Sequence, residues 1–156
     1  MVWSEDVLSV ILAVVLGVVL GLEREIRGKA AGLRTNTLIC LGAAVFTIIS
    51  ERIGGGREAS PARIAAQIVT GVGFLGAGAI IRSRGGIHGL TTAATIWMVA
   101  SIGMACGAGF FLLAVTSTII ALIVLIGLTP LERWVGSLKR KHKLKAEPSV
   151  QSEDNG

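Results

Sequence analysis

The residues of this sequence that could bind a ligand lie mainly at the ends of its apolar segments, where one carboxylate meets amide, hydroxyl and guanidinium groups. Magnesium prefers oxygen ligands and often uses one or two carboxylates together with water. Glu23 and Asn36 provide such oxygens and are the predicted metal ligands. Two interpretations remain open: an ion-pair network that joins helix ends, and a pocket for a cation or an anionic ligand. The candidate binding residues at these ends are Glu23, Arg24, Arg34, Thr35, Asn36, Arg82, Thr91 and Thr92.

Two further candidates, Arg63 and Gln67, stand in the third apolar segment, where Thr70 follows them at helical spacing. Polar groups at membrane depth cost free energy unless they face protein or water, so they mark candidate sites. Arg63 is interpreted either as part of a site or as an anchor at the membrane interface. Gln67 is expected to bond across helices, and that bond could be purely structural. No carboxylate lies deep in any predicted span, so an ion path would use amide, hydroxyl and backbone oxygens.

The composition requires a membrane protein. The chain is 52% hydrophobic and only 16% charged, with a mean hydropathy of +0.73, and it has no acidic residue between Glu58 and Glu132. A soluble domain averages about 25% charged residues. A spanning helix needs about 20 apolar residues. We therefore predict an all-α, polytopic transmembrane helix bundle with five spans, at residues 7–22, 35–50, 62–81, 90–107 and 110–128.

The basic residues predict the orientation of this bundle. Most of the 15 Lys and Arg residues fall in alternate connections and in the C-terminal segment, which places the N-terminus outside and the C-terminus in the cytoplasm. Thr129 to Glu132 has the spacing of a capping box, which predicts a new helix. We divide the chain into a transmembrane domain (1–128), a basic amphipathic helix (129–145) and a disordered tail (146–156). The helix lies on anionic lipid or acts as a simple stop-transfer anchor.

Glycines form the most repetitive feature of the sequence, which has 21 of them. Residues 71–78 match a dinucleotide-binding pattern, but the match lies inside an apolar span and no acid follows before Glu132, so we reject that function. Glycines instead let membrane helices approach closely, or serve as hinges. No catalytic motif is present, and we expect no enzyme activity. The predicted packing residues are Gly17, Gly21, Gly71, Gly73, Gly76, Gly78, Gly103 and Gly107.

The same motifs carry a family resemblance. Gly-Leu-Glu-Arg (21–24), Ala-Gly-Leu-Arg-Thr-Asn (31–36), Arg-Ile-Ala-Ala-Gln (63–67), the glycine-rich run 71–78 and Gly-Leu-Thr-Thr-Ala-Ala-Thr-Ile-Trp (89–97) resemble the MgtC/SapB membrane family over residues 7–128. Asn36 stands where a histidine is frequent in that family, so a titratable role is not carried over. The chain resembles the short, SapB-like form without the C-terminal ACT-like domain.

The resemblance implies a multi-pass protein of the bacterial cytoplasmic membrane, associated with growth in low magnesium and, in pathogens, with survival inside host cells. We expect a factor in magnesium homeostasis or stress adaptation that binds a ligand or partner proteins. The alternatives are a transporter or channel, with Glu23, Asn36, Gln67 and Thr91 along the path, and a structural membrane subunit. The expected partners are the lipid bilayer, anionic lipid, and a second copy or other membrane proteins. We expect no nucleic acid and no cofactor beyond a Mg²⁺ ligand.

Overall fold

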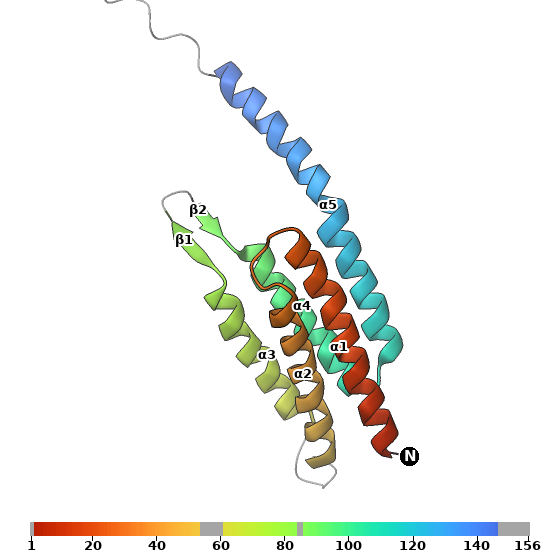
Figure 1. Cartoon of the computed structure of the whole chain (residues 1–156). Coiled ribbons are helices and arrows are strands. Elements are labelled where there is room, and N and C mark those ends of the chain that lie inside the picture. Colours follow the sequence, from red (N-terminus) through yellow and green to blue (C-terminus); the bar gives the residue numbers. More distant parts are fainter. Residues whose placement is uncertain (1, 54–60, 84–85, 147–156) are drawn as a thin grey trace, which may run out of the picture. The chain divides into compact units, whose positions relative to one another are not determined.

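The computed structural model describes residues 2–53, 61–83 and 86–146 of the 156-residue chain. These residues form five α-helices and one two-stranded hairpin, which Figure 1 colours along the chain. In order, the elements are α1 (Val2–Ile26), α2 (Leu33–Ile53), α3 (Pro61–Gly78), β1 (Ile81–Ser83), β2 (Gly86–His88), α4 (Leu90–Gly107) and α5 (Phe111–Ala146).

Four of the described helices, α1, α2, α4 and α5, are long and apolar enough to cross a membrane. Their apolar stretches are 18 to 23 residues long, and at 1.5 Å per residue 20 residues span about 30 Å, the thickness of the hydrocarbon core. The described apolar part of α3, Ala65–Gly78, is shorter than that. The predicted all-α transmembrane bundle is confirmed, while the number of spans and the orientation stay predictions.

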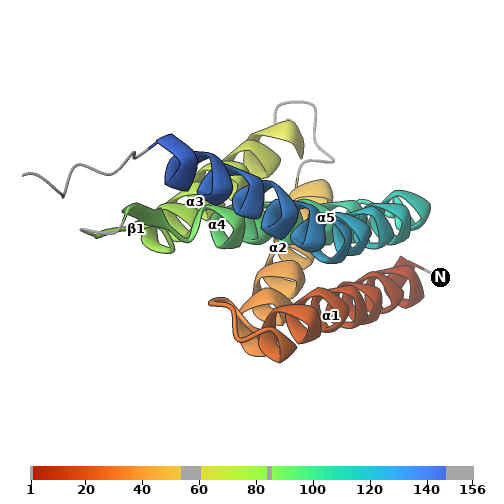
Figure 2. The same cartoon turned by 90° about the horizontal axis from the view of Figure 1, so that it is seen from above.

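The chain divides into two compact units, residues 1–121 and 122–156. The first unit contains α1 to α4, the hairpin and the first part of α5, and the second contains the remainder of α5. Within the first unit, α2 lies between α1 and α3 in both views (Figures 1 and 2), and α4 packs against α1, α2 and α3. A core cluster joins α2, α3 and α4, made of Ala43, Ile68, Val72, Ile96 and Ala100.

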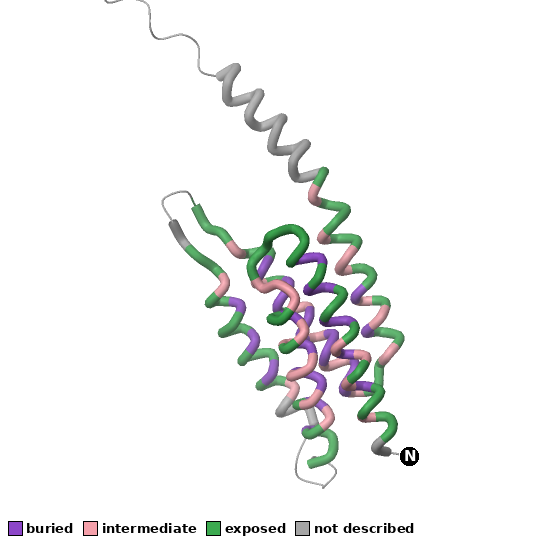
Figure 3. The backbone as a smooth tube through the Cα atoms, viewed as in Figure 1, coloured by how far each residue is buried: buried purple, intermediate pink, exposed green. Residues whose placement is uncertain are grey.

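Burial follows the helical period on α1, α2 and α4, where buried and exposed positions alternate around each helix (Figure 3). On α1, for example, Ala13, Leu16 and Leu20 are buried, whereas Ile11 and Val15 are about half exposed. Exposed valine and isoleucine are expected on a helix that faces lipid, because hydrocarbon tails are as apolar as these side chains.

Two glycines bring α1 against α2. A Cβ atom at Gly17 would lie 2.9 Å from Thr37 Cα, and one at Gly21 would lie 2.8 Å from Leu33 Cα. Any larger residue would therefore push the two backbones apart. Because the residue numbers fall on α2 as they rise on α1, these two helices are antiparallel.

Two further glycines bring α4 against α2. A Cβ atom at Gly103 would meet Cys40 O, and one at Gly107 would lie 2.5 Å from Ala44 O. Here the residue numbers rise together, so α2 and α4 run parallel. Both helices consequently begin at the same end of the bundle, the end at which α1 finishes.

The glycines of α3 differ from the four glycines that join α1 and α4 to α2. At Gly71, Gly73 and Gly78 no heavy atom of the described residues, apart from the adjoining backbone of α3 itself, lies within 4 Å of where a Cβ would be. At Gly76 the nearest atoms belong to Ala93 at 3.7 Å, which is ordinary contact. The close packing predicted at Gly71, Gly73 and Gly78 is therefore not made with the described part of the chain.

The structure departs from two predicted boundaries. The third helix ends at Gly78 rather than at residue 81, and Ile81 begins the antiparallel β1–β2 hairpin, in which it pairs with His88. No new helix starts at Thr129, because α5 continues through Pro130 to Ala146. Thr129 Oγ1 donates a hydrogen bond to Leu125 O at 2.8 Å, one turn back in α5, instead of capping a later helix.

The position of residues 129–145 on a membrane surface remains a prediction, and the tail predicted from residue 146 lies almost wholly outside the described residues.

Candidate functional site

The end of the bundle where α1 finishes and where α2 and α4 begin contains its most deeply buried polar side chains. Arg24 is 3% exposed, although it lies in the last turns of α1. Its Nη2 donates a hydrogen bond to Thr92 Oγ1 on α4 at 2.7 Å. Its Nε is buried and has no hydrogen-bond partner. This contact joins the end of α1 to the first turn of α4.

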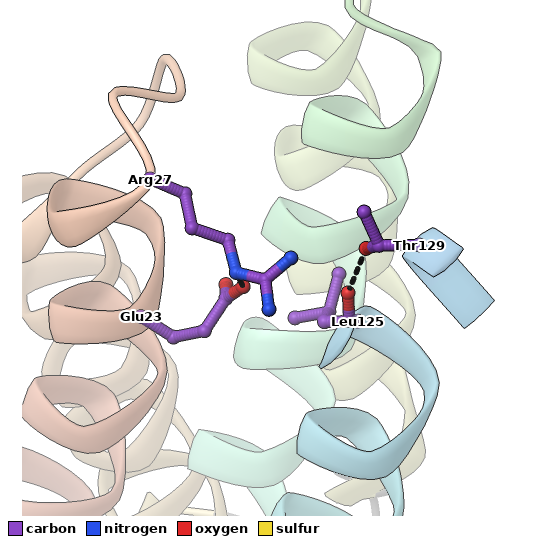
Figure 4. Close-up of polar contacts among 4 residues, drawn as sticks. All are labelled: Glu23, Arg27, Leu125 and Thr129. Atoms are coloured by element: carbon purple, nitrogen blue, oxygen red, sulfur yellow. Dashed lines mark hydrogen bonds and ion pairs between the residues drawn. The ribbon is translucent and has the colours of Figure 1, made fainter. Parts of the chain in front are cut away.

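Glu23 lies beside Arg24 and is also buried, with 9% of its surface exposed. Its Oε1 lies 2.7 Å from Nε of Arg27, one turn further along α1, and the two side chains form an ion pair (Figure 4). The second carboxylate oxygen, Oε2, is buried and accepts no hydrogen bond. One half of this carboxylate is therefore held by a guanidinium, and the other half is unpaired.

Asn36, in the first turn of α2, is completely buried. Its Nδ2 donates to Ala31 O and to Gly32 O, the latter at 3.0 Å, so the amide holds the connection between α1 and α2. Ala31 has a φ of 56°, a left-handed conformation that is uncommon for a residue with a Cβ. Asn36 Oδ1 is buried and unpaired. The side chain thus fixes a strained connection and keeps one free oxygen.

Glu25, which is not among the predicted site residues, caps α2. Its Oε2 accepts a hydrogen bond from Leu33 N, the first N–H of the helix, at 3.0 Å. The first N–H groups of a helix have no partner within the helix, and a carboxylate there is also favoured by the helix dipole. The capping-box pattern does not predict this hydrogen bond, because the carboxylate belongs to the preceding helix, eight residues before Leu33.

The helix α4 begins without such a cap. Its N-cap residue is Gly89, with a φ of 88°, and no side chain accepts a hydrogen bond there. A Cβ at this position would meet Ala79 O, so the close approach of the chain after α3 also requires glycine.

The other predicted site residues are placed differently. Arg34, Thr35 and Thr91 are at the same end but are exposed. Gln67 is exposed on α3, where it lines an apolar groove of about 540 Å³ between α2 and α3, and it makes no hydrogen bond within the described residues. The interhelical bond predicted for Gln67 is thus not formed within the described chain. The side chains of Arg63 and Arg82 lie outside the described part of the chain.

The charges at this end do not favour a bare metal ion. Among the described residues, no three His, Cys, Asp or Glu side chains come together as a metal-binding group. Glu23 is bound to Arg27 and adjacent to Arg24, so two guanidinium groups accompany a single carboxylate. A divalent cation would add to an existing positive excess in a buried region, where unpaired charge is costly. Glu23 and Asn36 fit magnesium only as acceptors for its bound water.

Four long apolar helices, close glycine contacts and a buried polar cluster at one end define a polytopic membrane protein. The model of the MgtC family matches residues 10–134, and the chain belongs to this family.

Relatives include an uncharacterised protein of Synechocystis, 45% identical over 86% of this chain and 57% of its own length. The protein MgtC of Brucella abortus is 48% identical over 70% of this chain and 45% of its own length. An Escherichia coli K12 protein named "Putative magnesium transporter YhiD" is 44% identical over 78% of this chain and 60% of its own length. The chain thus spans about half the length of the curated relatives it matches. No solved structure matches it.

Proposed function

We propose that this protein serves magnesium homeostasis, or adaptation to low magnesium, in the bacterial cytoplasmic membrane, and that it acts by binding a ligand or a partner protein rather than by covalent chemistry. One observation carries the proposal. Glu23 Oε2, Arg24 Nε and Asn36 Oδ1 are all buried near one end of the bundle without a hydrogen-bond partner. Buried polar groups are normally paired, so unpaired ones mark a place where water or a ligand is bound.

Membership of the MgtC family and the name of the E. coli relative support the link to magnesium. That name also supports a second candidate function, a transporter for magnesium or another small solute. The charges favour the first function. In the described helices, every Asp and Glu lies near a helix end or beyond the apolar stretch of α5, so the middle of the bundle has no carboxylate to bind a cation.

A growth assay tests the proposal. Bacteria that lack their own MgtC-family protein and grow poorly in low magnesium would receive the wild-type chain, Glu23→Gln or Asn36→Ala. We expect the wild type to restore growth and the two variants to fail although they are inserted and folded. Thr70→Val changes an exposed residue of α3 and serves as the control. Normal growth with both Glu23 and Asn36 variants would contradict the assignment of the site.

A second experiment separates the two candidate functions. Purified protein would be placed in liposomes that contain a magnesium-sensitive dye, with empty liposomes as the control. We expect no magnesium flux above that of empty liposomes. Flux that disappears in Glu23→Gln or Asn36→Ala would instead establish the transporter.

A further inference from the structure

The helices α2 and α4 both begin at this end of the bundle, but their N-termini are capped differently. The first N–H of α2 donates to a carboxylate of the protein itself, Glu25 Oε2. The start of α4 has no side-chain cap, because Gly89 stands at the N-cap. The N–H groups of the first turn, at Leu90, Thr91 and Thr92, have no acceptor within a helix. A helix N-terminus of this kind, carrying partial positive charge, attracts anions.

A buried guanidinium reaches the same turn. Arg24 Nη2 donates to Thr92 Oγ1 at 2.7 Å, so the charge of Arg24 lies against the first turn of α4. Arg24 is not a member of the ion pairs that Arg27 forms with Glu23 and that Arg52 forms with Asp6. Arg24 Nε has no partner of any kind. Arg24 is 3% exposed and forms no direct ion pair within the described part of the chain, and the neighbouring Glu23 carboxylate is already bound to Arg27. A further anion would therefore compensate the buried charge of Arg24.

We propose that Arg24 and the first turn of α4 form a binding site for a phosphate group. This inference rests on the proposed function, since it names the ligand class for the donor part of the same site. Glu23 Oε2 and Asn36 Oδ1 are acceptors and pair with water or another donor instead. A phosphate presents several oxygens in different directions, which can accept hydrogen bonds from the Arg24 guanidinium and from the N–H groups of the helix. The unpaired Nε of Arg24 is a further donor for such a group once the ligand displaces its neighbours. Leu90 and Thr91 are exposed, so the first turn is open to an approaching ligand.

The phosphate has two possible sources. The site lies where apolar stretches of α1, α2 and α4 end, the depth at which lipid headgroups are found. A phospholipid headgroup and free phosphate share the chemistry that the site recognises. The site does not require a divalent metal, which agrees with the positive charge excess around Glu23.

The test measures binding to the purified full chain. Radiolabelled inorganic phosphate would be titrated against the protein in zwitterionic phosphatidylcholine nanodiscs by equilibrium dialysis. In parallel, native mass spectrometry would compare retention of phosphatidylglycerol with that of phosphatidylcholine. We expect saturable binding of one phosphate group per chain in at least one arm, and the arm that responds identifies the source.

Two variants locate the binding. Arg24→Lys keeps the charge but removes Nε and the planar fork, so we expect binding to weaken about tenfold or more, as for loss of a charge-assisted hydrogen bond. Lys29→Gln removes an exposed positive charge from the nearby connection and should bind like the wild type. Equal weakening in both variants would show a diffuse charge effect and would overturn the site.

Binding measurements on the wild type alone also test the phosphate site. Absence of saturable binding in both arms would overturn the proposal even if Arg24→Lys did not fold. Failure of this inference is distinct from failure of the proposed function. If phosphate does not bind but Glu23→Gln still abolishes growth in low magnesium, the ligand class alone is wrong. If phosphate binds but the Glu23 and Asn36 variants grow normally, the link to magnesium is wrong.

Discussion

Arg24 on α1 and Thr92 on α4 are 68 residues apart in sequence and are joined by a buried hydrogen bond of 2.7 Å. Thr92 is itself 5% exposed, so water does not easily replace either partner. The bond is part of the structural support of the bundle as well as of the candidate site.

Thr92→Val should destabilise the protein, because it keeps the shape of the side chain but removes the acceptor for Arg24 Nη2. Leaving a buried donor unpaired costs about 1–3 kcal/mol, and more when the donor is charged. Unfolding in detergent, followed by the intrinsic fluorescence of tryptophan, measures the loss. Thr70→Val is the matched control, since Thr70 is exposed and bonds only to Ala66 O of its own helix. Equal stability of the two variants would contradict the importance of the Arg24–Thr92 bond.

Glu25→Gln tests the cap of α2. The variant keeps an acceptor for Leu33 N but loses the negative charge at the start of the helix, so we expect a loss of about 0.5–1 kcal/mol, with a larger loss of about 1–2 kcal/mol for Glu25→Ala. The same unfolding assay at low ionic strength measures both. Glu51→Gln, an exposed change in the last turns of α2, should cause no loss. A stable Glu25→Ala variant would mean that water caps α2 equally well.

Alanine substitutions at Gly21 and Gly71 should change the stability of the protein in different ways. Gly21→Ala places a Cβ 2.8 Å from Leu33 Cα and should destabilise the bundle by about 1–3 kcal/mol, because two backbones must separate. Gly71→Ala meets no atom of another described element and should be neutral, or stabilising by up to about 1 kcal/mol through helix propensity.

Thermal unfolding of both variants, together with their oligomeric state by cross-linking, gives the readout. Destabilisation of Gly71→Ala that accompanies loss of an oligomer would show that a second chain packs on α3. Equal destabilisation of both variants without a change of assembly would contradict the glycine geometry.

The sequence was sufficient to predict the helices, because apolar runs such as residues 90–107 and the Pro at position 61 leave few alternatives. Placing Glu23 and Asn36 at one end of the bundle followed from the alternation of helix directions. The burial of Arg24 could not be predicted in this way, because it depends on how closely α1 approaches α4. Gly17 and Gly71 look alike in sequence, yet only the first meets a neighbouring backbone.

The two incorrect boundaries also have physical reasons. Pro130 lacks a backbone N–H, which favours the start of a helix, but a single missing donor does not end α5, which continues to Ala146. In the β1–β2 hairpin after α3, Gly86 has a φ of 122° and Gly89 one of 88°. Glycine permits these backbone conformations but does not require them, so the sequence alone did not predict the hairpin. The Glu25 cap was missed because it depends on the folded connection between α1 and α2.

Asn36→Asp should be more damaging than Asn36→Ala, although aspartate is nearly the same size as asparagine. The Nδ2 group of Asn36 donates to Ala31 O and Gly32 O, and a carboxylate in its place would set its own oxygen against those two carbonyl oxygens. Asn36 is 0% exposed, so the new charge would also be removed from water.

We expect Asn36→Ala to cost about 1–3 kcal/mol through its lost hydrogen bonds, and Asn36→Asp to cost more at neutral pH. The difference should shrink as the pH falls, because a protonated aspartic acid can donate to one of the two carbonyls. Thr35→Ala, on the exposed side of the same helical turn, is the control and should change neither stability nor its pH dependence. If Asn36→Asp were as stable as the wild type at neutral pH, a cation would have to neutralise the new carboxylate, either Arg24 or a bound metal ion. Stability that depends on added magnesium would then favour magnesium over phosphate as the ligand of this site.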